Sequence, residues 1–67
     1  MEYTDFVVTG RPQDLEALGD TFNFKPIDGT FDEKKRQTTI RVFGDPGFFL
    51  FGFERQGYGR IVERVIK

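Results

Sequence analysis

The chain contains no cysteine, no histidine and no tryptophan among its 67 residues. Without cysteine it has no disulfide bonds and no thiolate metal ligands. Without histidine it lacks the side chain that most readily exchanges a proton near neutral pH, so a general base would require a carboxylate or lysine with a strongly shifted pKa. We therefore expect a protein that is not an enzyme and that holds no metal or cofactor.

Long apolar runs are also missing. No segment approaches the roughly 20 apolar residues that a membrane-spanning helix needs. The first residues, Met1–Asp5, lack the basic and apolar regions of a secretory signal peptide. From these absences we expect a soluble, cytoplasmic protein without membrane contact, and the length predicts a single domain over residues 1–67.

Charge is balanced overall but uneven along the chain. The formal net charge is −1. Residues 1–33 hold eight acidic and two basic residues, whereas residues 34–67 hold eight basic and three acidic residues. This division predicts an acidic side and a basic side that orient a charged partner, provided that the two halves do not interleave in space.

Phenylalanine is abundant, with nine in the chain and five of them within residues 43–53. The segment Gly44–Gly47 has the composition of a tight turn. It separates residues 38–43 from residues 48–53, and alternation in both segments predicts a hairpin. On the second strand the larger apolar set is expected to face the core and the smaller set to face away, which places Phe49, Phe51 and Phe53 inward and Phe48 and Leu50 outward.

The remaining elements are predicted from periodicity. Residues 3–9 alternate as a strand, and Pro12 opens a helix whose apolar residues repeat at helical spacing up to Phe22. The segment Asn23–Gln37 is rich in turn signals and is interpreted as a loop. Apolar residues in 58–66 also recur at helical spacing, but most are β-branched, so a helix is favoured and a strand is the alternative.

Together these elements predict an α+β fold. We expect a single small domain with a three-stranded, or alternatively four-stranded, antiparallel sheet and one or two helices packed on one face. The predicted order is β-α-β-β-α, with strand order 1-3-2 in the sheet. The residues expected in the core are Phe6, Val8, Leu15, Leu18, Phe22, Ile40, Val42 and Phe51.

The Phe-rich segment and the order of elements permit a comparison with one known family. The predicted order is similar to that of an RNA-recognition motif, in which aromatic side chains on the third strand stack with bases. Gly47–Phe53 opens with the Gly-aromatic pair typical of that motif. However, Phe49 stands where a small residue belongs and Leu50 replaces the next aromatic, so we do not assign the chain to this family.

The outward face of the predicted hairpin is the candidate binding surface. Aromatic and arginine side chains are enriched in protein interfaces. We therefore expect a small non-enzymatic protein-binding module, an inhibitor or adaptor that acts by occlusion, of the size of accessory proteins of viruses or mobile elements. The candidate partner-binding residues are Arg41, Phe43, Phe48, Leu50, Arg55 and Arg60.

Two alternatives use the same face. In the first, single-stranded nucleic acid stacks its bases on the Phe side chains while basic residues contact phosphates. In the second, two copies of the chain pair as a homodimer through this face or through a free strand edge. Another protein is the favoured partner, because the acidic first half and the pI of about 5.3 disfavour nucleic acid.

Overall fold

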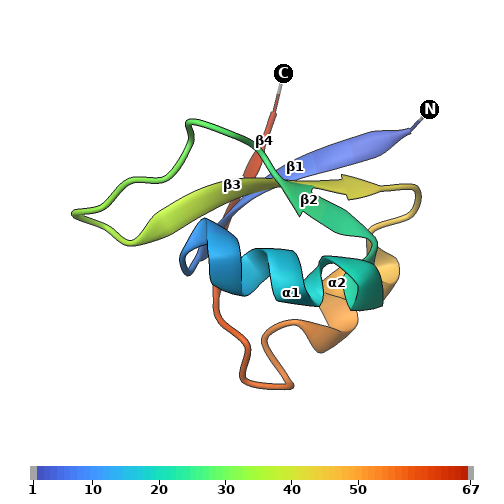
Figure 1. Cartoon of the computed structure of the whole chain (residues 1–67). Helices are drawn as coiled ribbons and strands as arrows, with labels where there is room; N and C mark the ends of the chain where they lie inside the picture. Colours follow the sequence, from blue (N-terminus) through green and yellow to red (C-terminus); the bar gives the residue numbers. More distant parts are fainter. Residues whose placement is uncertain (1, 67) are drawn as a thin grey trace.

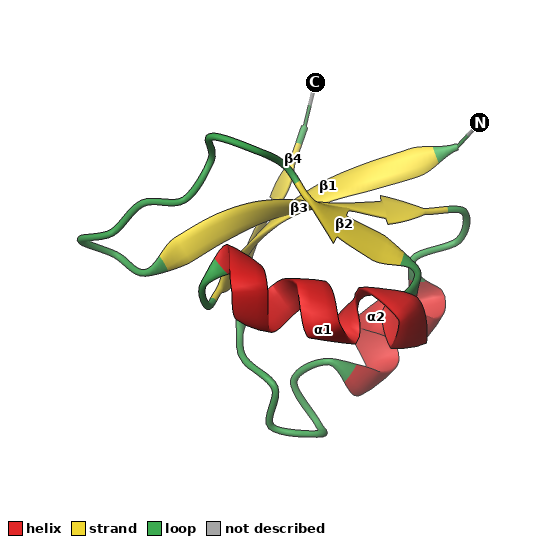
Figure 2. Ribbon diagram, viewed as in Figure 1, coloured by secondary structure: helices red, strands yellow, loops and turns green. Residues whose placement is uncertain are grey.

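The computed structural model describes residues 2–66 and shows a small α+β fold in two layers (Figures 1 and 2). A four-stranded antiparallel sheet has the order β2-β3-β1-β4, and both helices lie on one of its faces. The predicted fold class is therefore confirmed, with the fourth strand present. The elements in chain order are β1 (Tyr3–Thr9), α1 (Pro12–Phe22), β2 (Phe24–Pro26), β3 (Gln37–Phe43), α2 (Gly47–Gly52) and β4 (Ile61–Val65).

The core lies between the sheet and the two helices. β1 and β3 pair along their full length, from Tyr3 opposite Phe43 to Thr9 opposite Gln37. Their alternate residues face the helices, as the sequence pattern predicts. Of the predicted core residues, six are buried, Leu18 is partly buried and packs against them, and Phe51 is exposed. The buried apolar residues are Phe6, Val8, Leu15, Phe22, Phe24, Ile40, Val42, Phe49 and Phe53.

Helix α1 has the predicted extent and packs closely against β2. Pro12 occupies its first turn, where the missing N–H costs no hydrogen bond. Asn23 ends the helix in the left-handed conformation, with φ of 58°. Gly19 is buried, and a Cβ atom at this position would stand 2.5 Å from the carbonyl oxygen of Phe24. Glycine here therefore permits the close approach of the helix to the strand.

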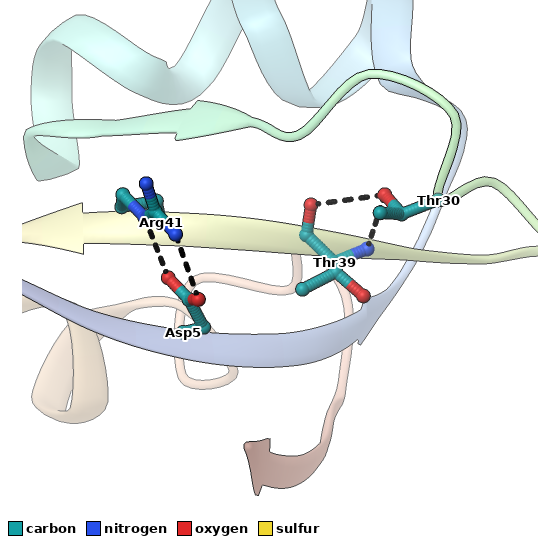
Figure 3. Close-up of polar contacts among 4 residues, drawn as sticks. All are labelled: Asp5, Thr30, Thr39 and Arg41. Atoms are coloured by element: carbon teal, nitrogen blue, oxygen red, sulfur yellow. Dashed lines mark hydrogen bonds and ion pairs between the residues drawn. The ribbon is translucent and has the colours of Figure 1, made fainter. Parts of the chain in front are cut away.

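The segment 23–37, predicted to be a loop, contains more structure than expected. Phe24–Pro26 forms β2, and Asp32 forms an isolated bridge with Gln37. Between them, the Thr30 hydroxyl accepts a hydrogen bond from the Thr39 N–H at 3.1 Å and donates one to the Ile27 carbonyl at 2.6 Å. Figure 3 shows Thr30 beside Thr39, so the loop stays hydrogen-bonded to the edge of β3 after β2 has ended.

The Phe-rich segment is helix α2, so the predicted second strand of the hairpin is wrong. The carboxylate of Asp45 accepts a hydrogen bond from the N–H of Gly47, the first residue of α2, at 2.8 Å. Leu50 then donates its N–H to the Pro46 carbonyl at 2.9 Å. The Asp45 side chain thus closes a turn directly before α2, and Pro46, the N-cap residue, restricts the backbone where the helix begins. These local signals outweigh the alternation of the phenylalanines. The comparison with an RNA-recognition motif fails for the same reason.

Helical geometry also corrects the assignment of side chains to faces. Phe49 and Phe53 are four residues apart on one side of the helical segment, and both are fully buried. Phe51, predicted to be core, has a relative exposure of 66%. The outward assignment of Phe48 and Leu50 is confirmed, at 65% and 48% exposure. They do not, however, belong to a sheet face.

We expect Asp45→Ala to weaken the start of α2. Loss of the hydrogen bond from the Gly47 N–H to the Asp45 carboxylate should lower the free energy of unfolding by about 0.5 to 1.5 kcal/mol, the usual net contribution of one hydrogen bond. Asp45→Asn keeps an acceptor oxygen and serves as the matched control. Urea unfolding followed by circular dichroism measures both. An equal loss in both variants would show that the hydrogen bond is not what stabilises the helix start.

The C-terminal segment is strand β4, so the favoured helix over 58–66 is wrong and the alternative is correct. The β-branched residues Ile61 and Val65 pair with Val8 and Asp5 of β1. The register shifts between Val7 and Val8, and Val62 is the extra residue of β4 at this irregularity. The turn before β4 approaches β1 through Gly59, where a Cβ atom would stand 3.0 Å from the Thr9 hydroxyl. The predicted strand order 1-3-2, which places residues 48–53 between the other two strands, is also wrong. Residues 48–53 form no strand, and β1 pairs directly with β3, the predicted second strand.

Candidate functional site

Helix α2 presents an apolar surface to solvent beside its buried phenylalanines. Phe48, Phe51, Gly52 and Arg55 follow the spacing i, i+3, i+4, i+7, because the backbone continues in helical turns after α2. The Phe53 N–H donates to the Phe49 carbonyl, and the Gln56 N–H donates to the Gly52 carbonyl, both at 3.0 Å. This spacing aligns two exposed aromatic rings and one guanidinium along one stripe.

The ring of Phe22, at the C-terminus of α1, forms the floor under this stripe. It is 4% exposed, and its centroid lies 5.5 Å from that of Phe48 and 5.9 Å from that of Tyr58. Gly52 lies against it, since a Cβ atom there would stand 3.0 Å from the Phe22 ring. The result is a pocket of about 320 Å³, here called the aromatic groove. Its lining residues are Thr21, Phe22, Phe48, Phe51, Gly52, Arg55, Gln56 and Tyr58.

Arg55 is the charged residue among the described residues that line the aromatic groove. Its guanidinium carbon lies 4.7 Å from the centroid of the Phe51 ring, within the range of a cation–π contact. Such a contact orients the side chain over the rim. The groove can therefore bury an apolar group while offering N–H donors at its edge.

The open face of the sheet carries a different arrangement around Asp5, which is 4% exposed. The Arg41 Nε and Nη2 atoms donate to the two Asp5 carboxylate oxygens at 3.0 and 3.2 Å (Figure 3). The guanidinium carbon of Arg41 lies 3.9 Å from the centroid of the Tyr3 ring. The hydrogen bond to Asp5 raises the pKa of Arg41 above its ordinary value.

The six predicted partner-binding residues fall into separate places. Phe48 and Arg55 line the aromatic groove. Arg41 and Phe43 lie on the open face of β3, where Arg41 is engaged by Asp5 and Phe43 stands half-buried opposite Tyr3. Leu50 is exposed on α2 and does not line the groove. Arg60 precedes β4, where its backbone N–H donates to the Thr9 hydroxyl at 2.9 Å.

Sequence reasoning missed Phe51 and Tyr58 as groove residues. The sequence pattern places Phe51 in the core and Tyr58 in a helix, whereas Phe51 is exposed on α2 and Tyr58 is 47% exposed in the turn before β4. The i, i+3, i+4, i+7 spacing from Phe48 to Arg55, together with Asp45 and Pro46 as a helix start, would have found the stripe. The contribution of Tyr58 depends on its contact with Phe22, which no local pattern reveals.

Neither helix in residues 2–66 has the length and apolar character needed to cross a bilayer. Over the same residues, no three acidic side chains converge in a way that could hold a metal ion. Comparisons with protein-family models, with curated proteins and with solved structures find no match to this chain.

Proposed function

We propose that this protein is a small non-enzymatic binding module that uses the aromatic groove to hold a bulky apolar side chain of another protein. The observation that carries the proposal is the exposure of large apolar side chains around one pocket: Phe48 at 65%, Phe51 at 66% and Tyr58 at 47%. Exposed aromatic side chains that gather on one surface are typical of protein interaction sites. A groove of this size accepts one or two side chains, which fits the docking of a short segment in a cytoplasmic adaptor or inhibitor.

Charge favours a protein partner over nucleic acid. Single-stranded nucleic acid also stacks on exposed aromatic rings, but it requires a basic path for the phosphates. The described groove lining supplies one cation, Arg55, and the chain as a whole is slightly acidic. Pairing of two copies through their grooves would bring two Arg55 side chains together, which disfavours the homodimer.

Substitutions on α2 separate the groove from the rest of the helix. A displayed library of random peptides is selected against the parent protein, and the enriched peptides are measured by calorimetry. We expect Phe51→Ser to weaken their binding about tenfold or more, as for a central aromatic contact. Phe48→Ser should act in the same direction, because its ring also lines the groove.

Leu50→Ser is the matched control, because Leu50 is exposed on the same helix but does not line the groove. Its peptide affinity should equal that of the parent. Equal losses in Leu50→Ser and Phe51→Ser would contradict the proposal, as would selected peptides that bind Phe51→Ser at full strength. Light scattering of the parent tests the homodimer, since self-association that Phe51→Ser abolishes would assign the groove to a second copy.

A further inference from the structure

Two arginines in this fold lie over aromatic rings, and they differ in whether a carboxylate also binds the guanidinium. Arg41 lies over Tyr3 and donates two hydrogen bonds to the carboxylate of Asp5. Arg55 lies over Phe51, yet within residues 2–66 its guanidinium makes no hydrogen bond and no ion pair. One arrangement thus consists of ring, guanidinium and carboxylate, whereas the other has the ring and the guanidinium alone.

The missing element has a defined chemistry. A guanidinium carries five N–H donors in a planar fork that matches the two oxygens of a carboxylate. Contact with an aromatic ring leaves these donors available and holds the side chain in place, so less conformational entropy is lost when a carboxylate binds. Arg41 and Asp5 show this geometry, at 3.0 and 3.2 Å, within the same molecule.

The nearby acidic residues do not supply the carboxylate. Glu54, adjacent in sequence to Arg55, accepts a hydrogen bond from the Ile61 N–H at 2.9 Å and faces β4. Asp20, near the end of α1, lines a separate pocket between α1 and β2. Neither belongs to the described lining of the aromatic groove.

We propose that the segment which enters the aromatic groove carries an aspartate or glutamate next to its bulky apolar residue, and that this carboxylate pairs with Arg55. This inference rests on the proposed function, because it specifies the partner of the same groove. The apolar side chain covers Phe48, Phe51 and Tyr58, while the acidic side chain completes the arrangement that Asp5 completes at Arg41.

Capped tetrapeptides test this charge selectivity directly. The probes are N-acetylated, C-amidated Gly-Glu-Phe-Gly, its Gln and Lys analogues at the second position, and Gly-Glu-Gly-Gly, which lacks the aromatic ring. Capping removes the terminal carboxylate, so that a side chain is the acidic group. Each is titrated into the labelled protein while the Gly52 and Tyr58 amides and the Arg55 Nε–H are followed by NMR.

We expect the Glu-Phe peptide to bind about two- to five-fold more tightly than the Gln-Phe peptide, the range for one exposed ion pair. The Lys-Phe peptide should bind more weakly than both, and the peptide without the ring should not bind. Arg55→Gln should remove the difference between the Glu and Gln peptides. Arg60→Gln should preserve it, since Arg60 is exposed but does not line the groove.

The outcomes distinguish failure of the acidic-partner proposal from failure of the proposed binding function. Equal binding of the Glu, Gln and Lys peptides at the groove would overturn the acidic partner and leave the apolar groove intact. The same result follows if Arg55→Gln keeps the preference for glutamate. Absence of shifts at Gly52 and Tyr58 with every Phe peptide would remove both proposals. If oligothymidylate binds the groove more tightly than the Glu-Phe peptide, the partner is nucleic acid instead.

Discussion

Replacement of Phe49 by alanine should destabilise this protein more than any substitution on the surface of α2. Phe49 is fully buried, and its ring centroid lies 5.0 Å from that of Phe53 and 5.2 Å from that of Phe6. Removal of a buried phenylalanine ring costs about 3 to 5 kcal/mol, because apolar burial is lost and a cavity remains. A domain of this length has a total stability of roughly 3 to 10 kcal/mol, so the variant should be largely unfolded at moderate temperature.

Phe51→Ala is the matched control, two residues away on the same helix. Its ring is 66% exposed and contacts the Arg55 guanidinium, so truncation should cost less than about 1 kcal/mol. Thermal unfolding of both variants compares them, with Phe49→Leu added in case the alanine variant does not fold. Similar losses in Phe49→Ala and Phe51→Ala would indicate alternation along a strand and would contradict α2.

The second large effect is expected at Gly19. Alanine is the better helix former by about 1 kcal/mol, so propensity alone predicts that Gly19→Ala stabilises α1. A methyl group at this position would instead stand 2.5 Å from the Phe24 carbonyl oxygen, a backbone atom that has no flexible side chain to move aside. We expect the free energy of unfolding to fall by about 1 to 3 kcal/mol, as for other overpacked positions.

Asp20→Ala provides the control for helix propensity. Asp20 is the next residue of α1 and is exposed, so its replacement should be neutral or slightly stabilising. Urea unfolding of both variants gives the sign of each effect. An increase in stability for Gly19→Ala would mean that α1 does not lie against β2 at this distance.

The sequence predicts the elements whose periodicity allows one interpretation. In β1 and β3, the apolar residues that face the core alternate along each strand, and in α1 the residues from Leu15 to Phe22 repeat only at helical spacing. The Phe-rich segment fits both the strand period and the helix period. Phe49, Phe51 and Phe53 alternate as in a strand, whereas Phe49 and Phe53 are also four residues apart, as on one face of a helix. The turn formed by Asp45, Pro46 and Gly47 distinguishes them, because the Asp45 carboxylate accepts a hydrogen bond from the Gly47 N–H directly at the start of α2.

The candidate site is less predictable because distant segments form it. The Phe22 floor comes from α1, the Phe48 and Phe51 rings from α2, and Tyr58 from the turn before β4. Likewise, the outward position of Arg41 follows from alternation, but its ion pair with Asp5 depends on the register between β1 and β3. Residue types and periodicity identify the candidates, whereas the packing of α1 against α2 determines which of them meet.

The ring of Phe22 belongs to two environments at once. On one side it packs edge-on against Phe49 and Phe53 in the core, and on the other it forms the base on which a bound side chain would rest. Phe22 therefore contributes both to the stability of the fold and to the shape of the groove. A substitution of Phe22 would change the hydrophobic core as well as the binding surface. Substitutions of the exposed residues Phe51, Arg55 or Tyr58 can change what the groove binds with little loss of stability. A substitution of Phe22 requires compensating changes in the rest of the core. A bound segment should in turn raise the melting temperature, since its contact with Phe22 exists only in the folded chain.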